Sequence, residues 1–222
     1  PDYVPHPEAC LVTGITPQTA NEKGHKEADF AAIVHREMIE PGTCTVGYNS
    51  IRFDDQFIRA LFYRNFYDPY EREYANGNSR WDIIDLLRMC HDLRPDGIEW
   101  EYDETGKPTF RLEALASKNG IEQERAHDAL SDVRATIGLA RRVYDAQPRL
   151  FKYYFSLREK EKVRRIVNLQ HATPLVHTSR IYTSERGCTT VVLPLSVHPD
   201  QPNNIICYDL RHDPSTWIDA SS

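Results

Sequence analysis

The sequence predicts an α/β domain followed by a smaller β-rich domain, and three observations favour this fold class. Apolar residues make up 40% of the 222 residues and charged residues 27%, which is ordinary globular usage. Helix-type and strand-type patterns alternate over roughly the first 165 residues, whereas roughly the last 50 contain mainly β-type runs. No apolar run approaches the ~18 residues of a membrane span. We therefore expect an α/β domain over 1–168 and a β domain over 169–222.

Helices of the first domain are predicted from apolar periodicity and from residues that start or stop a helix. Thr16 and Pro17 suit the N-cap and the first helical position. The expected helices cover about 25–39, 54–65, 110–119, 129–147 and 150–167. The fourth has the clearest period, with a single apolar stripe formed by Leu130, Val133, Ile137, Ala140 and Val143. Such a stripe is typical of the face that an amphipathic helix packs against a core.

Strands are predicted from β-branched and apolar runs. They are expected at 43–49 and near 81, and then at 174–177, 188–195 and 204–210. Two or three strands are too few to cover the helices of the first domain, because sheets typically carry about five or six strands. We expect the chain to be a fragment that lacks the opening strands of its sheet and ends inside the second domain.

Charge is distributed unevenly along a chain whose net charge is −6. Nine basic and three acidic residues fall between Ala140 and Arg165, so this segment carries +6 and the remainder −12. Such a basic arm suits either a path for a polyanion or a solvated helix face. The five cysteines are scattered and form no C-x-x-C pair, which argues against a disulfide frame and a thiolate zinc site. A reducing, cytoplasmic location is expected.

Two groups of acidic and histidine residues are candidates for catalysis. His127 precedes a helix and Asp132 lies in its first turns, so the pair suits a general base beside a metal-bound water. A polar loop histidine and an acid that complements the helix dipole fit the same pattern. Asp54 and Asp55 follow a strand and open a helix, where α/β folds place metal and phosphate chemistry, although helix capping also explains them. Because adjacent side chains face different ways, we expect Asp54 to reach a cleft.

Aromatic and basic residues cluster in the segments 63–74 and 149–160. Aromatic faces that stack bases, between cations that bind phosphates, are typical of single-strand binding. Aromatic core edges with solvated cations are the alternative interpretation. Arg111 stands at the front of a helix, where it opposes the helix dipole, and this placement favours a phosphate contact.

Several longer motifs carry a resemblance to a known family. They are Gly47-Tyr-Asn-x-x-Arg-Phe-Asp-Asp55, Phe62-Tyr-Arg-Asn-Phe-Tyr-Asp-Pro-Tyr70, Ser79-Arg-Trp-Asp82, Phe110-Arg-Leu-Glu113 and Ala126-His-Asp-Ala129 with Asp132. Together they resemble the bacterial exonuclease I family, DEDDh-type 3′→5′ exonucleases that degrade single-stranded DNA. The resemblance runs from about Pro5 to Leu210.

The resemblance implies a ribonuclease-H-like exonuclease domain, here without its first strands, and part of an SH3-like β domain. It implies two Mg²⁺ ions held by four carboxylates, among them Asp54 and Asp132, with His127 as the base that deprotonates the attacking water. Nucleoside 5′-monophosphates are the implied products, in DNA repair and recombination. The implied DNA contacts are Arg111, Arg59, Tyr70, Tyr74, Arg88, Tyr153, Lys160 and Asn203. Single-stranded DNA 3′ ends and single-strand-binding protein are the implied partners, and a monomer is the implied state.

One departure from the family pattern concerns activity. The first family motif, Asp-x-Glu, is absent, because none of the seventeen Asp residues has Glu two positions later. Two of the four expected metal ligands are therefore missing. We expect residues 1–222 alone to be inactive and their full-length parent to be a 3′→5′ exodeoxyribonuclease. A catalytically dead nucleic-acid-binding module and a DEDDh exoribonuclease are the alternatives.

Overall fold

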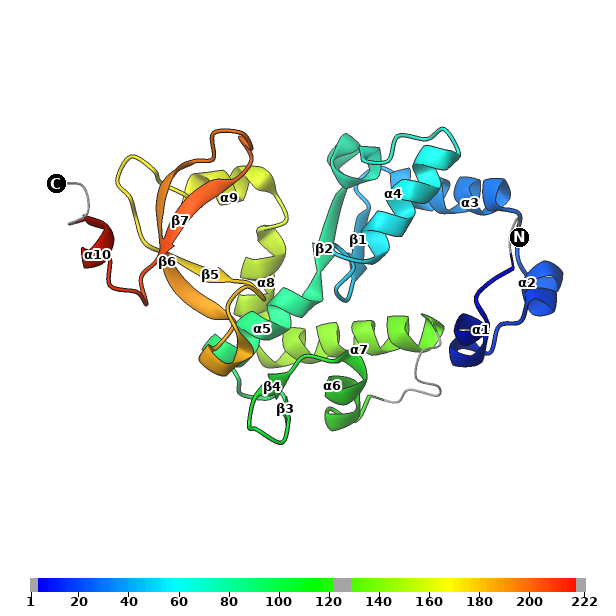
Figure 1. Ribbon diagram of the computed structural model, residues 1–222, viewed down its shortest axis with the longest axis horizontal. Coiled ribbons are helices and arrows are strands. Elements are labelled where there is room, and N and C mark those ends of the chain that lie inside the picture. Colours follow the sequence, from blue (N-terminus) through cyan, green and yellow to red (C-terminus); the bar gives the residue numbers. More distant parts are fainter. Residues whose placement is uncertain (1–3, 122–128, 219–222) are drawn as a thin grey trace. The chain divides into compact units, whose positions relative to one another are not determined.

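The computed structural model describes residues 4–121 and 129–218, which fall into two compact units (Figure 1). Unit 1 contains Pro1–Ile84 and Arg111–Arg142, and unit 2 contains Asp85–Phe110 and Val143–Ser222. Both units mix helices and strands, and the elements after residue 168 are mostly strands, as the sequence predicts. Each unit contains two separate segments of the chain, so the units do not correspond to the division predicted at 168/169, which stays a prediction.

Unit 1 is built around a pair of parallel strands. β1 (Cys44–Gly47) pairs with β2 (Ser79–Asp82). Parallel neighbours need a crossover connection, and α4 (Asp54–Arg64) lies in it, followed by two 3₁₀ turns, η1 (Glu71–Glu73) and η2 (Ala75–Gly77). The other helices of unit 1 are α1 (Pro7–Thr13), α2 (Pro17–Lys23), α3 (Glu27–Ile39), α6 (Leu112–Lys118) and the first part of α7 (Ala129–Ala146).

A small hydrophobic cluster joins α3 to α4. Ala31 and Phe62 are fully buried in it and Leu61 is nearly so, and Tyr67 packs against the same cluster. Val34 and Met38 of α3 and Ile58 of α4 pack against it as well. The cluster therefore has helical spacing on both helices (31, 34 and 38; 58, 61 and 62), which explains why the periodicity of this region predicts its helices. The cluster therefore fixes α4, the helix that carries Asp54.

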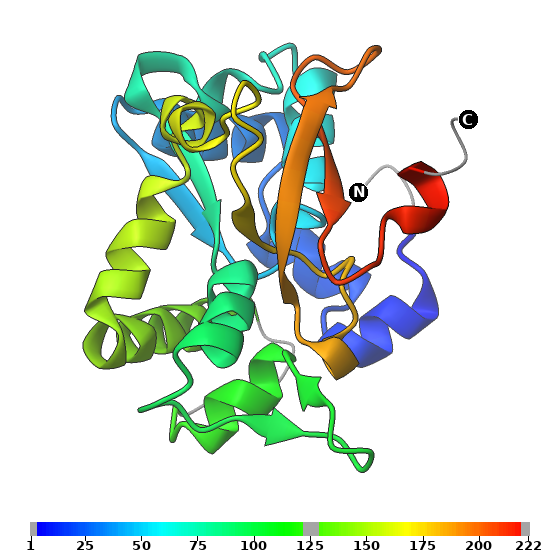
Figure 2. The same cartoon turned by 90° about the vertical axis from the view of Figure 1, so that its left-hand side faces the viewer.

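Unit 2 contains helices and a three-stranded antiparallel sheet. The sheet has the order β5–β6–β7, formed by β5 (Leu175–Thr178), β6 (Thr189–Val197) and β7 (Ile205–Asp209) (Figure 2). Its register shifts between Pro194 and Ser196, as a β-bulge does. The remaining elements are most of α5 (Ile83–Leu93), the hairpin β3 (Glu101–Tyr102)/β4 (Pro108–Thr109), the end of α7, α8 (Pro148–Ser156), α9 (Lys160–Ile166), η3 (Ser184–Arg186) and α10 (Ser215–Ile218).

The structure corrects two expectations. The helix expected over 150–167 is divided into α8 and α9, because Ser156 Oγ donates to the Tyr153 carbonyl at 2.7 Å and Glu159 has extended backbone. On α7, Leu130, Val133 and Ile137 are 57%, 53% and 46% exposed, whereas Ala135, Leu139 and Val143 are buried. The face of α7 that the described residues bury therefore differs from the predicted stripe in its first three members. None of the helices in the described ranges is long and apolar enough to span a bilayer.

Candidate active site

The turn that leads from β1 into α4 is held by a carboxylate from β2. Asp82 is buried, and its two oxygens accept the backbone N–H groups of Asn49 at 2.8 Å and Ile51 at 3.2 Å. Asn49 has φ 58°, a left-handed conformation that Asn tolerates better than most residues. The turn is thereby fixed just before Asp54, the first residue of α4.

Asp54 and Asp55 have opposite surroundings. Asp55 is 6% exposed and accepts hydrogen bonds from Arg72 Nη2 at 2.5 Å and Arg80 Nη1 at 2.6 Å. Asp54 is exposed, and no described residue forms a hydrogen bond or ion pair with its side chain. Asp55 therefore anchors the start of α4, while Asp54 presents its carboxylate to solvent. The assignment of Asp54 as a metal ligand stays a prediction.

Asp55 belongs to a network of ion pairs. Its members are Asp55, Arg59, Arg72, Glu73 and Arg80. Three arginines face two acids, so the network carries a net charge of +1. Arg59 donates to Glu73 at 2.8 and 3.0 Å, and this hydrogen bond raises the pKa of Arg59. Arg59, an expected DNA contact, is thus paired within the protein, and its guanidinium lies 4.9 Å from the centre of the Tyr70 ring.

The other residues expected at the metal are only partly described. Asp132 lies in the first turn of α7 and is half-buried. His127 lies outside the described residues, so its place beside Asp132 stays a prediction. Among residues 4–121 and 129–218, no three His, Cys, Asp or Glu side chains are grouped so as to hold a metal. Asp54 and Asp132 are both in unit 1 and offer the oxygen ligands that Mg²⁺ prefers, but they are two ligands of the four expected.

Three of the expected DNA contacts in unit 1, Tyr70, Tyr74 and Arg111, are accessible. Tyr70 and Tyr74 are 53% and 66% exposed, so each ring offers a face for stacking. Arg111 is exposed at the N-cap position of α6. An anion bound there would meet both its guanidinium and the helix N-terminus.

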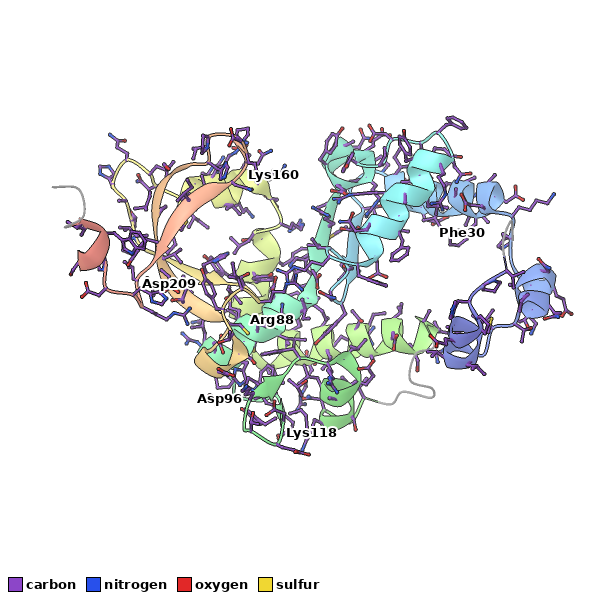
Figure 3. The ribbon with its side chains drawn as sticks, viewed as in Figure 1. Phe30, Arg88, Asp96, Lys118, Lys160 and Asp209 are labelled. Carbon is purple, nitrogen blue, oxygen red and sulfur yellow. The ribbon has the colours of Figure 1, made fainter. Side chains whose placement is uncertain are left out.

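Expected contacts in unit 2 fall into two kinds. Lys160 on α9 (Figure 3) and Asn203 line the same cavity, of about 390 Å³, together with Arg164 and several apolar side chains. Tyr153 is 50% exposed and lines another, of about 640 Å³. Arg88 is different, because it donates to Asp85 at 2.6 Å and its side chain is only 11% exposed.

Two residues of the site, Asp82 and Arg164, are not predicted from the sequence. The sequence shows Asp82 only as the last residue of the Ser79-Arg-Trp-Asp82 motif, although Asp82 holds the turn before Asp54. The sequence shows Arg164 only as one charge of the basic segment 140–165, although Arg164 shares a cavity with Lys160 and Asn203. Charge density was the only signal for Arg164, since nothing in its spacing shows which basic side chains share a cavity.

Comparisons with known proteins agree with the two-part fold. The profile of the Exonuclease family matches residues 1–140, and that of the Exonuclease I SH3-like domain matches residues 158–222. Exodeoxyribonuclease I of Haemophilus influenzae is 51% identical over 212 residues, which are 96% of this chain and 45% of the relative. Exodeoxyribonuclease I of Escherichia coli is 48% identical over 221 residues, which are 100% of this chain and 46% of the relative.

Solved structures show the same likeness. Escherichia coli Exonuclease I in complex with a dA16 oligonucleotide superposes with a TM-score of 0.91 and 49% identity, over 98% of this chain and 46% of that one. Other similar structures are an ExoI/SSB-Ct complex and a zinc-ion-bound E. coli ExoI–ssDNA complex. The chain spans about half the length of the curated relatives that it matches.

Proposed function

This chain belongs to the exonuclease family, and from that premise we propose that it serves the stepwise hydrolysis of single-stranded DNA from the 3′ end. The relatives named Exodeoxyribonuclease I, and the oligonucleotide complex of one of them, support this substrate. The observation that carries the proposal is that two adjacent carboxylates have different environments. Asp55 is buried beneath the start of α4, while Asp54 faces solvent at the end of a parallel strand pair.

The proposal includes divalent metal ions. A similar ExoI–ssDNA complex binds zinc, and the family resemblance implies two Mg²⁺ ions. Asp54 and Asp132 would be two of the ligands, and the remaining ones would come from outside the described residues. Bound divalent ions supply an activated water and neutralise developing phosphate charge.

The residues of this chain would then act in sequence. Arg111 binds the phosphate beside the 3′ end, and His127 takes the proton of the attacking water. The bond between phosphorus and the 3′ oxygen of the preceding nucleotide breaks, which frees a nucleoside 5′-monophosphate and a new 3′ hydroxyl. Tyr70, Tyr74 and Tyr153 stack on bases, while Lys160 and Asn203 bind the strand further along.

The proposed context follows from this substrate. Single-stranded 3′ ends arise during DNA repair and recombination, and we place the protein there as a monomer in the bacterial cytoplasm. The ExoI/SSB-Ct complex supports single-strand-binding protein as a partner.

Binding and turnover test the proposal separately. In a protein of the relatives' length that carries these residues, His127→Ala should lower the release of nucleotides from a labelled dT16 by roughly 100-fold or more. The Kd for the same oligonucleotide, measured by fluorescence anisotropy without metal, should change less than ~3-fold. Lys23→Gln, at an exposed site on α2, is the control and should alter neither. Normal turnover in His127→Ala, or nucleotide release by residues 1–222 alone, would contradict the assignment of base and ligands.

A further inference from the structure

Phe66 has a backbone conformation that its side chain does not favour. Four non-glycine residues among those described have positive φ, namely Asn49, Phe66, Asn76 and Ala172. Phe66 is the one large apolar residue of these, with φ 62°. Left-handed backbone is unfavourable for residues with a Cβ, and Asn tolerates it better than Phe.

The left-handed turn itself has a clear structural purpose. It ends α4, because the Tyr67 N–H donates to the Phe62 carbonyl at 3.0 Å and the Phe66 N–H donates to the Tyr63 carbonyl at 3.3 Å. This is a Schellman motif, and Phe66 occupies its C′ position, where glycine is the usual residue. The turn brings Tyr67 back onto the core, where its ring stacks on His35 with centroids 4.1 Å apart. The fold therefore requires the turn, but it does not require an aromatic side chain at position 66.

The Phe66 side chain contributes no burial to the fold. Phe66 is 98% exposed, the largest exposed fraction among the large hydrophobic residues described. A glycine would satisfy the turn with less strain and would expose less apolar surface. Residues with strained backbone are found disproportionately at functional sites.

The neighbours of Phe66 indicate what it binds. Tyr63 is 76% exposed, and Tyr70 and Tyr74, proposed above as stacking residues, follow within eight residues of Phe66. We propose that Phe66 is a further stacking residue for a nucleobase of single-stranded DNA, an inference that rests on the proposed function. A base stack suits an exposed ring on a rigid turn, because it needs only a free aromatic face and is tolerant of sequence.

The length of α4 places this contact away from the cleaved bond. α4 has eleven residues and is about 16 Å long. Asp54 is its first residue, and Phe66 lies two residues after its last, so the two are at opposite ends of the helix. Phe66 would therefore meet a nucleotide upstream of the one that is released. Its loss should weaken the binding of long oligonucleotides and leave a dinucleotide unaffected.

Three substitutions in the full chain test the proposal. Phe66→Gly should raise the Tm by roughly 2–4 °C and weaken binding of a fluorescent dT16 by at least ~5-fold, since one stacked base corresponds to ~5–150-fold. Phe66→Leu, apolar but without a π face, should weaken binding similarly. Phe66→Trp should keep Kd within ~3-fold, and its added fluorescence should be quenched by dT16. Phe30→Leu, at a 45% exposed ring on α3 (Figure 3), is the control and should leave Kd unchanged.

The outcomes separate this inference from the proposed function. If wild-type chain binds dT16 and Phe66→Gly and Phe66→Leu bind equally well, Phe66 is not a stacking residue and the proposed function stands. If a wild-type protein of the relatives' length that carries these residues binds no single-stranded DNA, both are overturned. Loss of binding to dT16 in Phe66→Gly together with a lowered Tm would assign Phe66 a structural role and overturn the inference.

Discussion

Asp55 illustrates how one buried carboxylate sets the conformation of its neighbour. Its carboxylate is bonded to Arg72, whose side chain is 2% exposed, and to Arg80. Without Asp55, the buried guanidinium of Arg72 would lose its carboxylate partner. Breaking a buried ion pair in this way typically lowers the free energy of unfolding by about 3–5 kcal/mol. The remaining acid of the network, Glu73, approaches Arg72 only at 3.8 Å.

We predict that Asp55→Ala lowers the free energy of unfolding by about 3–5 kcal/mol, measured by urea denaturation of the full chain. Asp54→Ala is the matched control, and it should change the free energy of unfolding by no more than about 0.5 kcal/mol because its side chain is exposed. Similar losses in the two variants would mean that the network does not fix the start of α4.

The sequence predicts only part of this arrangement. Adjacent side chains diverge, so one of the two carboxylates had to face away from the other, and Asp54 is the exposed one. The partners of Asp55 lie 17 and 25 residues further along the chain. Pairings over such separations depend on how β2 and η1 pack, and no local pattern encodes them.

At the scale of elements, α7 shows why periodicity locates a helix better than it orients one. The spacing of its apolar residues correctly predicts a helix, which spans Ala129–Ala146. The helix carries apolar residues on two faces, and the periodic stripe chosen from the sequence is not the one that the described residues bury. Periodicity gives the angle between side chains, whereas the covered face depends on which other element packs there.

A pair of substitutions on α7 distinguishes its two faces. Leu139 is fully buried and Ile137 is 46% exposed. Leu139→Ala should lower the free energy of unfolding by about 2–5 kcal/mol, because it leaves a cavity in the core. Ile137→Ala should lower it by less than about 1 kcal/mol. Urea denaturation of the two variants at equal protein concentration makes the comparison, and the reverse order would restore the face predicted from the sequence.

The division of the basic segment into α8 and α9 has a similar cause. Composition predicts one basic, aromatic helix over 150–167, and α8 (Pro148–Ser156) and α9 (Lys160–Ile166) together cover most of that range. The break depends on a local competition, in which the Ser156 hydroxyl bonds to a backbone carbonyl and Glu159 adopts extended backbone. Serine is common inside helices as well, so its presence alone does not predict where a helix ends.

At the scale of the whole molecule, the net charge is negative, but the positive charge is concentrated in one segment, which favours a local path for a polyanion. The chain carries −6, while residues 140–165 carry +6. The long-range electrostatic interaction depends on net charge, and a net charge of −6 repels DNA. Contacts with individual phosphates depend instead on local cations. Lys160 and Arg164 line one cavity of unit 2, so both are placed for such contacts, and Arg164 also pairs with Glu161 at 2.7 Å.

The salt dependence of binding separates local contacts from net charge. Each phosphate contact on a single strand contributes about −0.7 to the slope of log K against log salt concentration. Replacing both Lys160 and Arg164 by Gln should therefore flatten the slope for dT16 by about 1.4 and weaken binding most at low salt. The control replaces Lys23 and Lys26 by Gln, which changes the net charge equally at exposed sites of unit 1. If net charge governs binding, the two double variants will show equal slopes; if Lys160 and Arg164 bind phosphates, only theirs will flatten.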